Sequence, residues 1–214
     1  MTTLITGANR GIGRAMFDAY RARGVAVTGT HRDAARTDIL RLDVADPGSV
    51  AQMARDFGEG RLDLLVCNAG VYPDKGMALE DLTAGLWAQA FAVNVTGVFL
   101  TIQAMLPNLR AAKGKIAIIS SQMASDTKAP GGSYIYRASK AAALNLGRNL
   151  AVDLKGDGIA VGIYHPGWVQ TDMGGRSASI TPDAAADGLL ARFEELSLAT
   201  TGCFRTWDGQ DHPF

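Results

Sequence analysis

The stretch LITGANRGIG, residues 4–13, decides the fold of this chain. An apolar strand pattern runs into a loop with three glycines, and a helical pattern begins directly after it. Glycines at these positions permit positive φ, let the backbone approach a pyrophosphate and allow the helix to pack on the strand. The helix N-terminus then offers N–H groups and a positive dipole to phosphates. The stretch therefore predicts a dinucleotide site, although a simple tight turn also uses glycines.

The rest of the chain continues this alternation of strands and helices. Strands are expected at residues 4–6, 24–30, 39–44, 62–67, 115–119, 158–164 and 201–204, and later helices at 47–57, 85–106, 131–154 and from 181 onward. No repeat or low-complexity stretch intervenes. The pattern predicts an α/β fold with a doubly wound parallel sheet of about seven strands, a Rossmann fold, in a single domain over residues 1–214.

Composition narrows the classes of partner. The chain has 214 residues, 47% of them hydrophobic, and its 21 Lys+Arg balance its 21 Asp+Glu. No net field favours nucleic acid or an acidic membrane, so a small molecule is the expected partner. Cys67 and Cys203 lack metal-ligand or redox spacing, and no metal site is expected. With no signal peptide and no unbroken apolar run near ~18 residues, a soluble, cytoplasmic protein is expected.

The end of the second strand bears on the choice of cofactor. In dinucleotide folds an acid at this place accepts from the ribose 2′-hydroxyl of NAD, whereas arginine pairs with the 2′-phosphate of NADP. Here Arg32 follows His31, and Arg10 in the glycine loop adds a second positive charge. NADP(H) is therefore favoured, while Asp33 keeps NAD(H) possible. Asp43 and Val44 end the third strand beside the expected adenine.

The link between the second and third strands is short. Only residues 33–38 separate the two patterns, although a parallel crossover normally takes a dozen residues or more. We expect a short extended link in place of a helix, which leaves the adenine side less covered.

Polar and small residues gather where later strands end. Asn-Ala-Gly closes the fourth strand at residues 68–70, and two serines, Ser120 and Ser121, close the fifth. Ligands bind at these carboxyl ends in open α/β sheets. Asn94 is a polar residue in an otherwise apolar helix, so it either bonds the helix backbone or holds a water near the reacting centre.

Tyr136 and Lys140 stand four residues apart and share one face of the predicted helix. The pair suggests a proton donor with its own pKa modifier. Tyr134 is a competitor, but Ala138 stands four residues beyond it.

Six motifs in order give the chain a resemblance to the short-chain dehydrogenase/reductase family over nearly its whole length. They are TGANRGIG at 6–13, NAG at 68–70, NVTG at 94–97, SS at 120–121, YRASK at 136–140 and PG at 166–167. Residues 136–140 and 166–173 further resemble the carbonyl-reductase, C-factor and sniffer-type branch. The resemblance implies a homodimer or homotetramer, with the helices that hold Asn94 and Tyr136 forming the dimer face.

The resemblance implies a role for each motif residue. Tyr136 would be the general acid/base, Lys140 its modifier and ribose ligand, Ser121 the carbonyl-orienting donor and Asn94 the holder of a proton-relay water. A free tyrosine titrates near ~10, and the ammonium together with a nicotinamide cation should bring this pKa toward neutrality. The residues expected to contact the cofactor are Thr6, Gly7, Asn9, Arg10, Gly11, Ile12, Gly13, Arg32, Asp43, Val44, Asn68, Ala69, Gly70, Tyr136, Lys140, Pro166, Gly167, Val169 and Thr171.

The expected function is an NADP(H)-preferring oxidoreductase that transfers hydride between nicotinamide and a carbonyl or secondary alcohol. The alternatives are an NAD-dependent alcohol dehydrogenase and a non-catalytic NAD(P)-binding sensor or signalling protein. Ser121 lies two residues farther from Tyr136 than is usual in the family, so Ser120 stays a candidate for the catalytic serine. The path from Met173 to Thr181 is short, which implies a shallow, open pocket.

Overall fold

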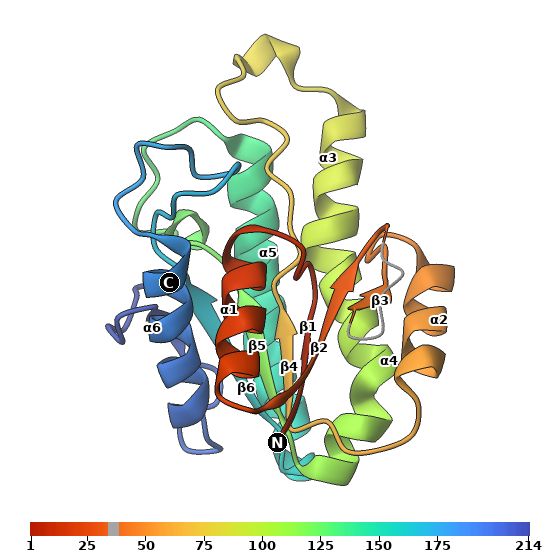
Figure 1. Ribbon diagram of the computed structural model, residues 1–214. Coiled ribbons are helices and arrows are strands. Elements are labelled where there is room, and N and C mark those ends of the chain that lie inside the picture. The colour runs from red at the N-terminus through yellow and green to blue at the C-terminus, as the bar shows by residue number, and fades with distance from the viewer. Residues whose placement is uncertain (34–38) are drawn as a thin grey trace.

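The computed structural model describes residues 1–33 and 39–214 and has one parallel sheet at its centre (Figure 1). Within those residues the strands lie in the order β3-β2-β1-β4-β5-β6-β7. Their bounds are β1 Thr2–Ile5, β2 Ala26–His31, β3 Ile39–Arg41, β4 Leu64–Cys67, β5 Lys115–Ile119, β6 Ala160–His165 and β7 Phe204–Thr206. Every neighbouring pair is parallel, which confirms the predicted doubly wound sheet.

Helices cover both faces of this sheet, as Figure 1 shows. They are α1 Gly11–Ala22, α2 Pro47–Phe57, α3 Ala84–Phe91, α4 Gly97–Ala112, α5 Tyr134–Asp153 and α6 Pro182–Glu195, with short helical turns at Leu79–Asp81, Gln122–Ala124 and Leu154–Asp157. Local chemistry sets several of these bounds. For example, Asp46 caps α2 by accepting from the Gly48 N–H at 2.9 Å, and Pro47 occupies the first turn.

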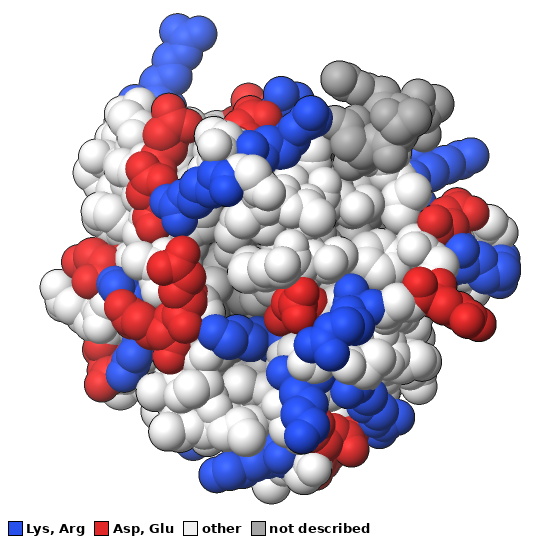
Figure 2. Space-filling view, turned by 60° about the horizontal axis from the view of Figure 1, so that its bottom comes forward, with Lys and Arg blue, Asp and Glu red and all other residues white. Residues whose placement is uncertain are grey.

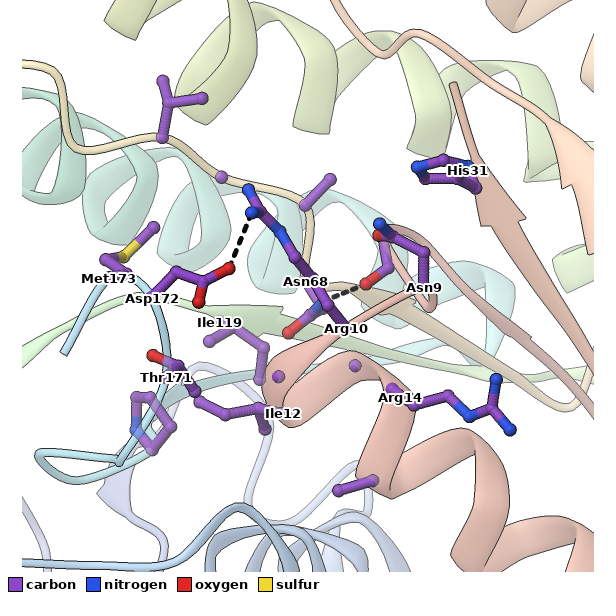
Figure 3. Close-up of a pocket in the computed structure, with 18 of the residues that line it drawn as sticks. Asn9, Arg10, Ile12, Arg14, His31, Asn68, Ile119, Thr171, Asp172 and Met173 are labelled. Carbon is purple, nitrogen blue, oxygen red and sulfur yellow. Dashed lines mark hydrogen bonds and ion pairs between the residues drawn. The ribbon is translucent and has the colours of Figure 1, made fainter. Parts of the chain in front are cut away.

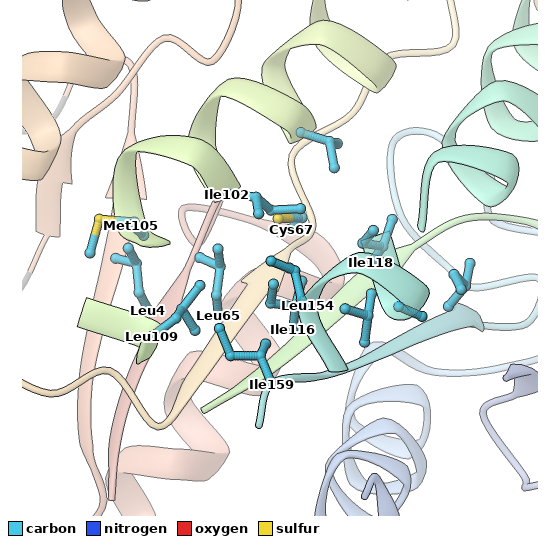
Figure 4. Packing of buried hydrophobic residues seen from close by; sticks show 14 of the residues in the cluster. Leu4, Leu65, Cys67, Ile102, Met105, Leu109, Ile116, Ile118, Leu154 and Ile159 are labelled. Carbon is cyan, nitrogen blue, oxygen red and sulfur yellow. The ribbon is translucent and has the colours of Figure 1, made fainter. Parts of the chain in front are cut away.

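Alternate residues of each central strand enter two separate hydrophobic cores. Leu4 of β1 packs with Ile102 and Met105 of α4 in the core under α2, α4 and α5 (Figure 4). Ile5, the next residue, packs with Phe17 of α1 in the core under α1 and α6. Because both faces are buried, a central strand such as β4 reads as a continuous apolar run, and the period of two is hidden.

The predicted helix over residues 85–106 differs most from the structure. It is helical from Ala84 to Ala112, but residues Ala92–Thr96 form a π-helical turn between α3 and α4. A π turn inserts an extra residue into the helix and turns the following side chains, an adjustment that apolar periodicity does not reveal. The predicted link at 33–38 falls mostly outside the described residues. The strands on either side of it, β2 and β3, are parallel neighbours as expected.

Charged side chains of both signs lie on the surface. Figure 2 shows Lys and Arg interspersed with Asp and Glu over the face it presents, with acidic side chains gathered toward the left.

The continuous helical segment Ala84–Ala112 has a window of mean hydropathy 1.5 and is long enough to cross a membrane by length and composition alone. A search for unbroken apolar runs does not find this segment, because polar residues interrupt it. Helices that cover a sheet pass the same test, and Val98, Ile102 and Met105 of this one pack on the sheet.

The topology places the glycine loop next to the Asn68–Gly70 turn. Strand order reverses between β1 and β4, which are hydrogen-bonded neighbours, and the chain leaves both strands at the same edge. Such a switch point opens a crevice at the carboxyl ends of the strands.

Candidate active site

A cleft of about 750 Å³ runs along the carboxyl ends of the strands, at the switch point. This volume lies within the range of sites for small molecules and cofactors. Sixteen of the residues expected at the cofactor line it: Gly7, Asn9, Arg10, Gly11, Ile12, Gly13, Arg32, Asp43, Val44, Asn68, Ala69, Gly70, Tyr136, Lys140, Pro166 and Thr171. Five of the six motifs therefore contribute residues to one cavity, the serine motif through Ser120, whereas Asn94 and Ser121 do not line it.

Three expected contacts do not line this cleft. Thr6 is buried, and its hydroxyl accepts from the backbone N–H groups of Asn68 and Ala69 at 2.9 and 3.0 Å. Gly167 takes a φ of 87°, and a Cβ there would meet Ile180 Cδ1 at 2.2 Å. Val169 is 3% exposed and pairs with Ile180 in a short bridge. In this structure, these three residues shape the wall behind the cleft.

The glycine loop has the geometry that a pyrophosphate requires. α1 begins at Gly11, whose φ is 55°, and the preceding Arg10 provides no side-chain cap. The Arg10 side chain therefore leaves the first N–H groups of the helix uncapped at the cleft. At Gly13 a Cβ would stand 2.2 Å from the carbonyl oxygen of Gly7, so only glycine fits. Asn68 ties the loop to β4 by donating to the carbonyls of Thr6 and Gly7 at 2.9 and 3.1 Å.

The two arginines expected near a 2′-phosphate lie differently. Arg32 is exposed and lines the cleft beside His31 at the end of β2. Arg10 instead pairs with Asp172 at 2.8 Å, and Figure 3 shows its side chain directed toward Asp172 and away from His31. Both partners of this ion pair are largely exposed, so it is weak. A role of Arg10 at a 2′-phosphate stays a prediction, since Arg10 lines the cleft and its guanidinium here is paired with Asp172.

Tyr136 and Lys140 are buried together on one face of α5. Tyr136 is 7% exposed and Lys140 5% exposed, whereas the competitor Tyr134 is 45% exposed. The Lys140 ammonium lies 5.7 Å from the centre of the Tyr136 ring and donates to the carbonyl of Ile119 at 2.9 Å. The spacing of four residues thus brings the phenol and the ammonium to the same point of the cleft.

The two serines at the end of β5 have different partners. The Ser120 hydroxyl donates to the Lys140 carbonyl at 3.0 Å and ties the strand to α5. Ser121 is hydrogen bonded to the Tyr136 hydroxyl, and its own oxygen accepts from the Met123 N–H at 3.1 Å. Of the two, Ser121 has its side chain at the phenol.

Burial dominates the titration of both central groups in the protein alone. It raises the pKa of Tyr136 above its usual value of 10.0, against a smaller lowering by the hydrogen bond with Ser121, and Tyr72 raises it further. Burial also lowers the pKa of Lys140 to about 8. The expected fall of the Tyr136 pKa toward neutrality is therefore absent from the chain itself, because desolvation disfavours the phenolate.

Asn94 lies in the π-helical turn and is 1% exposed. Its side chain accepts from the Val71 N–H and donates to the Val71 carbonyl, both at 2.9 Å, and donates to the Ser139 hydroxyl at 2.9 Å. One of the two options for Asn94 was a hydrogen bond to the backbone of its own helix. The side chain makes its bonds to Val71 and Ser139 instead. It fixes the chain that follows Gly70.

Two residues near the site had no signal in the sequence. Tyr72 stacks on Tyr136 with ring centres 4.1 Å apart, and Asp74 contacts the start of α5. Both lie in a loop, where neither periodicity nor a motif with a known mechanism marks the position of a side chain. Asp172 and Met173, which end the stretch 166–173, line the far wall of the cleft.

The chain matches a model of the short-chain dehydrogenase family over residues 1–180. A curated relative is C-signal of Myxococcus xanthus, 36% identical over 159 residues, which covers 72% of this chain and 94% of that protein.

Two solved structures are close in fold. The NADPH-bound carbonyl reductase from chicken fatty liver superposes with a TM-score of 0.90 at 29% identity, covering 100% of this chain and 98% of that one. The carbonyl reductase Sniffer of D. melanogaster has a TM-score of 0.92 at 26% identity, covering 100% and 99%. These likenesses extend over the whole chain and agree with the observed fold.

Proposed function

This chain belongs to the short-chain dehydrogenase family, and from that premise we propose that it is an NADP(H)-preferring carbonyl reductase with Tyr136 as its general acid/base. As a member of the family it is an oxidoreductase that uses a nicotinamide cofactor and acts on a small molecule. The observation that carries the proposal is the buried pair of Tyr136 and Lys140 in the cleft that the glycine loop also lines, with Ser121 hydrogen bonded to the Tyr136 hydroxyl.

The residues of the cleft fit a dinucleotide. The uncapped start of α1 and the space kept open by Gly13 would hold the pyrophosphate. Arg32 would pair with a 2′-phosphate, and Lys140 would reach the ribose beside the nicotinamide. When bound, the cofactor supplies or accepts the hydride.

The proton steps fall to the side chains of the chain. Ser121 donates a hydrogen bond that orients the substrate carbonyl beside Tyr136. The Tyr136 hydroxyl then gives its proton to the substrate oxygen as the carbonyl carbon gains hydride, or takes that proton back in alcohol oxidation. The Lys140 ammonium, 5.7 Å from the ring centre, stabilises the phenolate that results.

Replacing the catalytic phenol tests the proposal directly. Tyr136→Phe should lower kcat on a responsive ketone, aldehyde or quinone by about 10² to 10⁴, because it removes the proton donor. NADPH binding, followed by fluorescence, should change little. Tyr134→Phe is the matched control, since it removes the hydroxyl of an exposed tyrosine on the same helix, and it should keep full turnover. Equal activity of both variants would refute Tyr136 as the proton donor. No turnover of any carbonyl by the native chain would favour the non-catalytic sensor.

The coenzyme preference has its own test. The native enzyme should turn over faster with NADPH than with NADH, and Arg32→Ala should raise KM for NADPH by about tenfold or more while leaving NADH nearly unchanged, as expected for loss of a charged hydrogen bond. Arg55→Ala, an exposed arginine on α2, should alter neither value. A native preference for NADH would instead favour the NAD-dependent alcohol dehydrogenase.

We also infer a homodimer or homotetramer that assembles through α4 and α5. Large apolar side chains on both helices face outward, with Phe99 40% exposed and Val152 75% exposed.

A further inference from the structure

Residues 71–75 link Asn94, the start of α5 and the far wall of the cleft. Val71 is held by the Asn94 side chain through its N–H and its carbonyl. Four residues later, the Lys75 ammonium donates to the Met173 carbonyl at 2.7 Å. The two residues between them that carry polar side chains, Tyr72 and Asp74, both contact the first turn of α5.

Asp74 is a buried carboxylate at the helix N-terminus. It is 1% exposed and is the one Asp or Glu in the buried class among residues 1–33 and 39–214. Its Oδ2 accepts from the Ile135 N–H at 2.8 Å, and its Oδ1 accepts from the Tyr136 N–H at 3.2 Å. A buried carboxylate is costly without such partners, and here two N–H groups and the positive end of the helix dipole compensate it.

The helix has no local cap that could do the same. Ser133, at the N-cap position, takes the left-handed conformation with φ 52° and ψ 40°, and its side chain makes no cap hydrogen bond. The first turn of α5 contains no acidic residue. The carboxylate that caps α5 therefore comes from a residue 61 positions earlier than Ile135, and one of its two bonds is to the N–H of Tyr136 itself.

Tyr72 holds the ring of the same residue. The rings of Tyr72 and Tyr136 are stacked, with centres 4.1 Å apart and planes 17° apart. The Tyr72 hydroxyl is hydrogen bonded to the Ser133 hydroxyl, which fixes the stacking ring against the start of α5. One face of the Tyr136 ring is thus covered by Tyr72, and its backbone N–H is bound by Asp74.

We propose that Asp74 and Tyr72 are positioning residues for the reaction, which hold the backbone and the ring of Tyr136 in the place where its hydroxyl meets Ser121 and the substrate carbonyl. The inference rests on the proposed role of Tyr136 as proton donor. Geometry of this kind matters because a displacement of about 1 Å in a reacting group can cost on the order of 10² in rate. Asn94 contributes indirectly, since it fixes Val71 and so the start of the segment.

The test separates positioning from helix capping. Asp74→Asn keeps the shape of the side chain but turns one acceptor into a donor that faces an N–H, so kcat should fall about 10- to 100-fold. For Asp74→Asn, both KM and Kd for NADPH should stay within about twofold of the native values, because the substitution does not touch the glycine loop. The deuterium isotope effect on kcat measured with NADPD should rise, since the chemical step becomes limiting.

The matched control is Asp46→Asn, the same substitution at the cap of α2. It should leave kcat unchanged. If Asp74→Asn loses thermal stability but keeps kcat within twofold of native, Asp74 is a cap alone and the proposal is wrong.

Tyr72→Leu keeps the proposal testable where Asp74→Asn does not fold. It removes the stacked ring at a half-buried position and should lower kcat about fivefold or more, again with Kd for NADPH unchanged. Full activity of Tyr72→Leu would overturn the ring half of the proposal. If Tyr136→Phe is inactive while Asp74→Asn and Tyr72→Leu are fully active, only this inference fails. If Tyr136→Phe is fully active, the proposed function fails first.

Discussion

Lys140 and Tyr136 show how far burial alone sets the chemistry of a side chain. Both are pushed toward their uncharged forms, because burial raises the pKa of the phenol and lowers that of the ammonium to about 8. A phenolate at this position therefore needs positive charge beyond what the fold provides. A bound nicotinamide cation meets that need in the proposed mechanism.

The lowered pKa of Lys140 predicts a pH dependence of stability. Its pKa is about 8 in the folded chain and 10.5 in the unfolded chain, so the unfolded chain binds more protons between these values. Stability from this group therefore rises as pH increases from about 8 to 10.5. The free energy of unfolding of the native chain minus that of Lys140→Met should rise by roughly 3 kcal/mol across this window in urea titrations.

An exposed lysine provides the control for that measurement. Lys155→Met, on the short turn Leu154–Asp157, removes an exposed lysine and is measured in the same way. A curve for Lys140→Met that does not rise above this control would show that the Lys140 ammonium is not desolvated.

At the scale of elements, the unit formed by β1, the glycine loop and α1 depends on the absence of a side chain at Gly13. The helix can start beside the strand because Gly13 has no side chain, and a Cβ there would lie 2.2 Å from the Gly7 carbonyl oxygen. A second local feature is the π-helical turn at Ala92–Thr96, which contains Asn94 and brings its side chain to Val71. Both features position backbone groups at the edge of the cleft.

Adding one methyl group at Gly13 should disrupt this unit. Gly13→Ala should lower the free energy of unfolding by about 1–3 kcal/mol, because the loop and helix must separate. Kd for NADPH, measured by fluorescence titration, should rise at least tenfold. Gly156→Ala is the control, because a Cβ there meets nothing within 4 Å, and it should change stability by less than about 0.5 kcal/mol. Similar behaviour of the two variants would contradict the close approach seen at Gly13.

At the scale of the whole molecule, the strand order decides which loops meet. β1 and β4 are neighbours although about sixty residues separate them, so the glycine loop and Asn68 form one wall of the cleft. The same arrangement leaves the outer faces of α4 and α5 free of sheet contacts, with apolar side chains on the surface. An apolar face of this kind favours association with a second copy.

The inferred assembly predicts the effect of a surface charge. The native chain should sediment as a dimer or tetramer at micromolar concentration, and Phe99→Glu should shift it toward monomer, because a charge buried at an interface without a partner is costly. Leu198→Glu is the matched control, as Leu198 is also 40% exposed but lies after α6. A native chain that sediments only as monomer would refute the assembly.

The sequence by itself determined the fold class, the order of the strands and main helices, and sixteen of the residues that line the cleft. Those properties follow from local patterns, such as apolar runs, glycine spacing and a tyrosine four residues before a lysine, and the structure places the motif residues together. The tertiary structure alone decided that Ser121 and not Ser120 meets the phenol, that Arg10 pairs with Asp172, and that Thr6, Gly167 and Val169 stand behind the cleft. It also brought Tyr72 and Asp74 to Tyr136. These contacts join residues far apart in the chain through loops, and the path of a loop depends on packing and hydrogen bonds that no local pattern encodes.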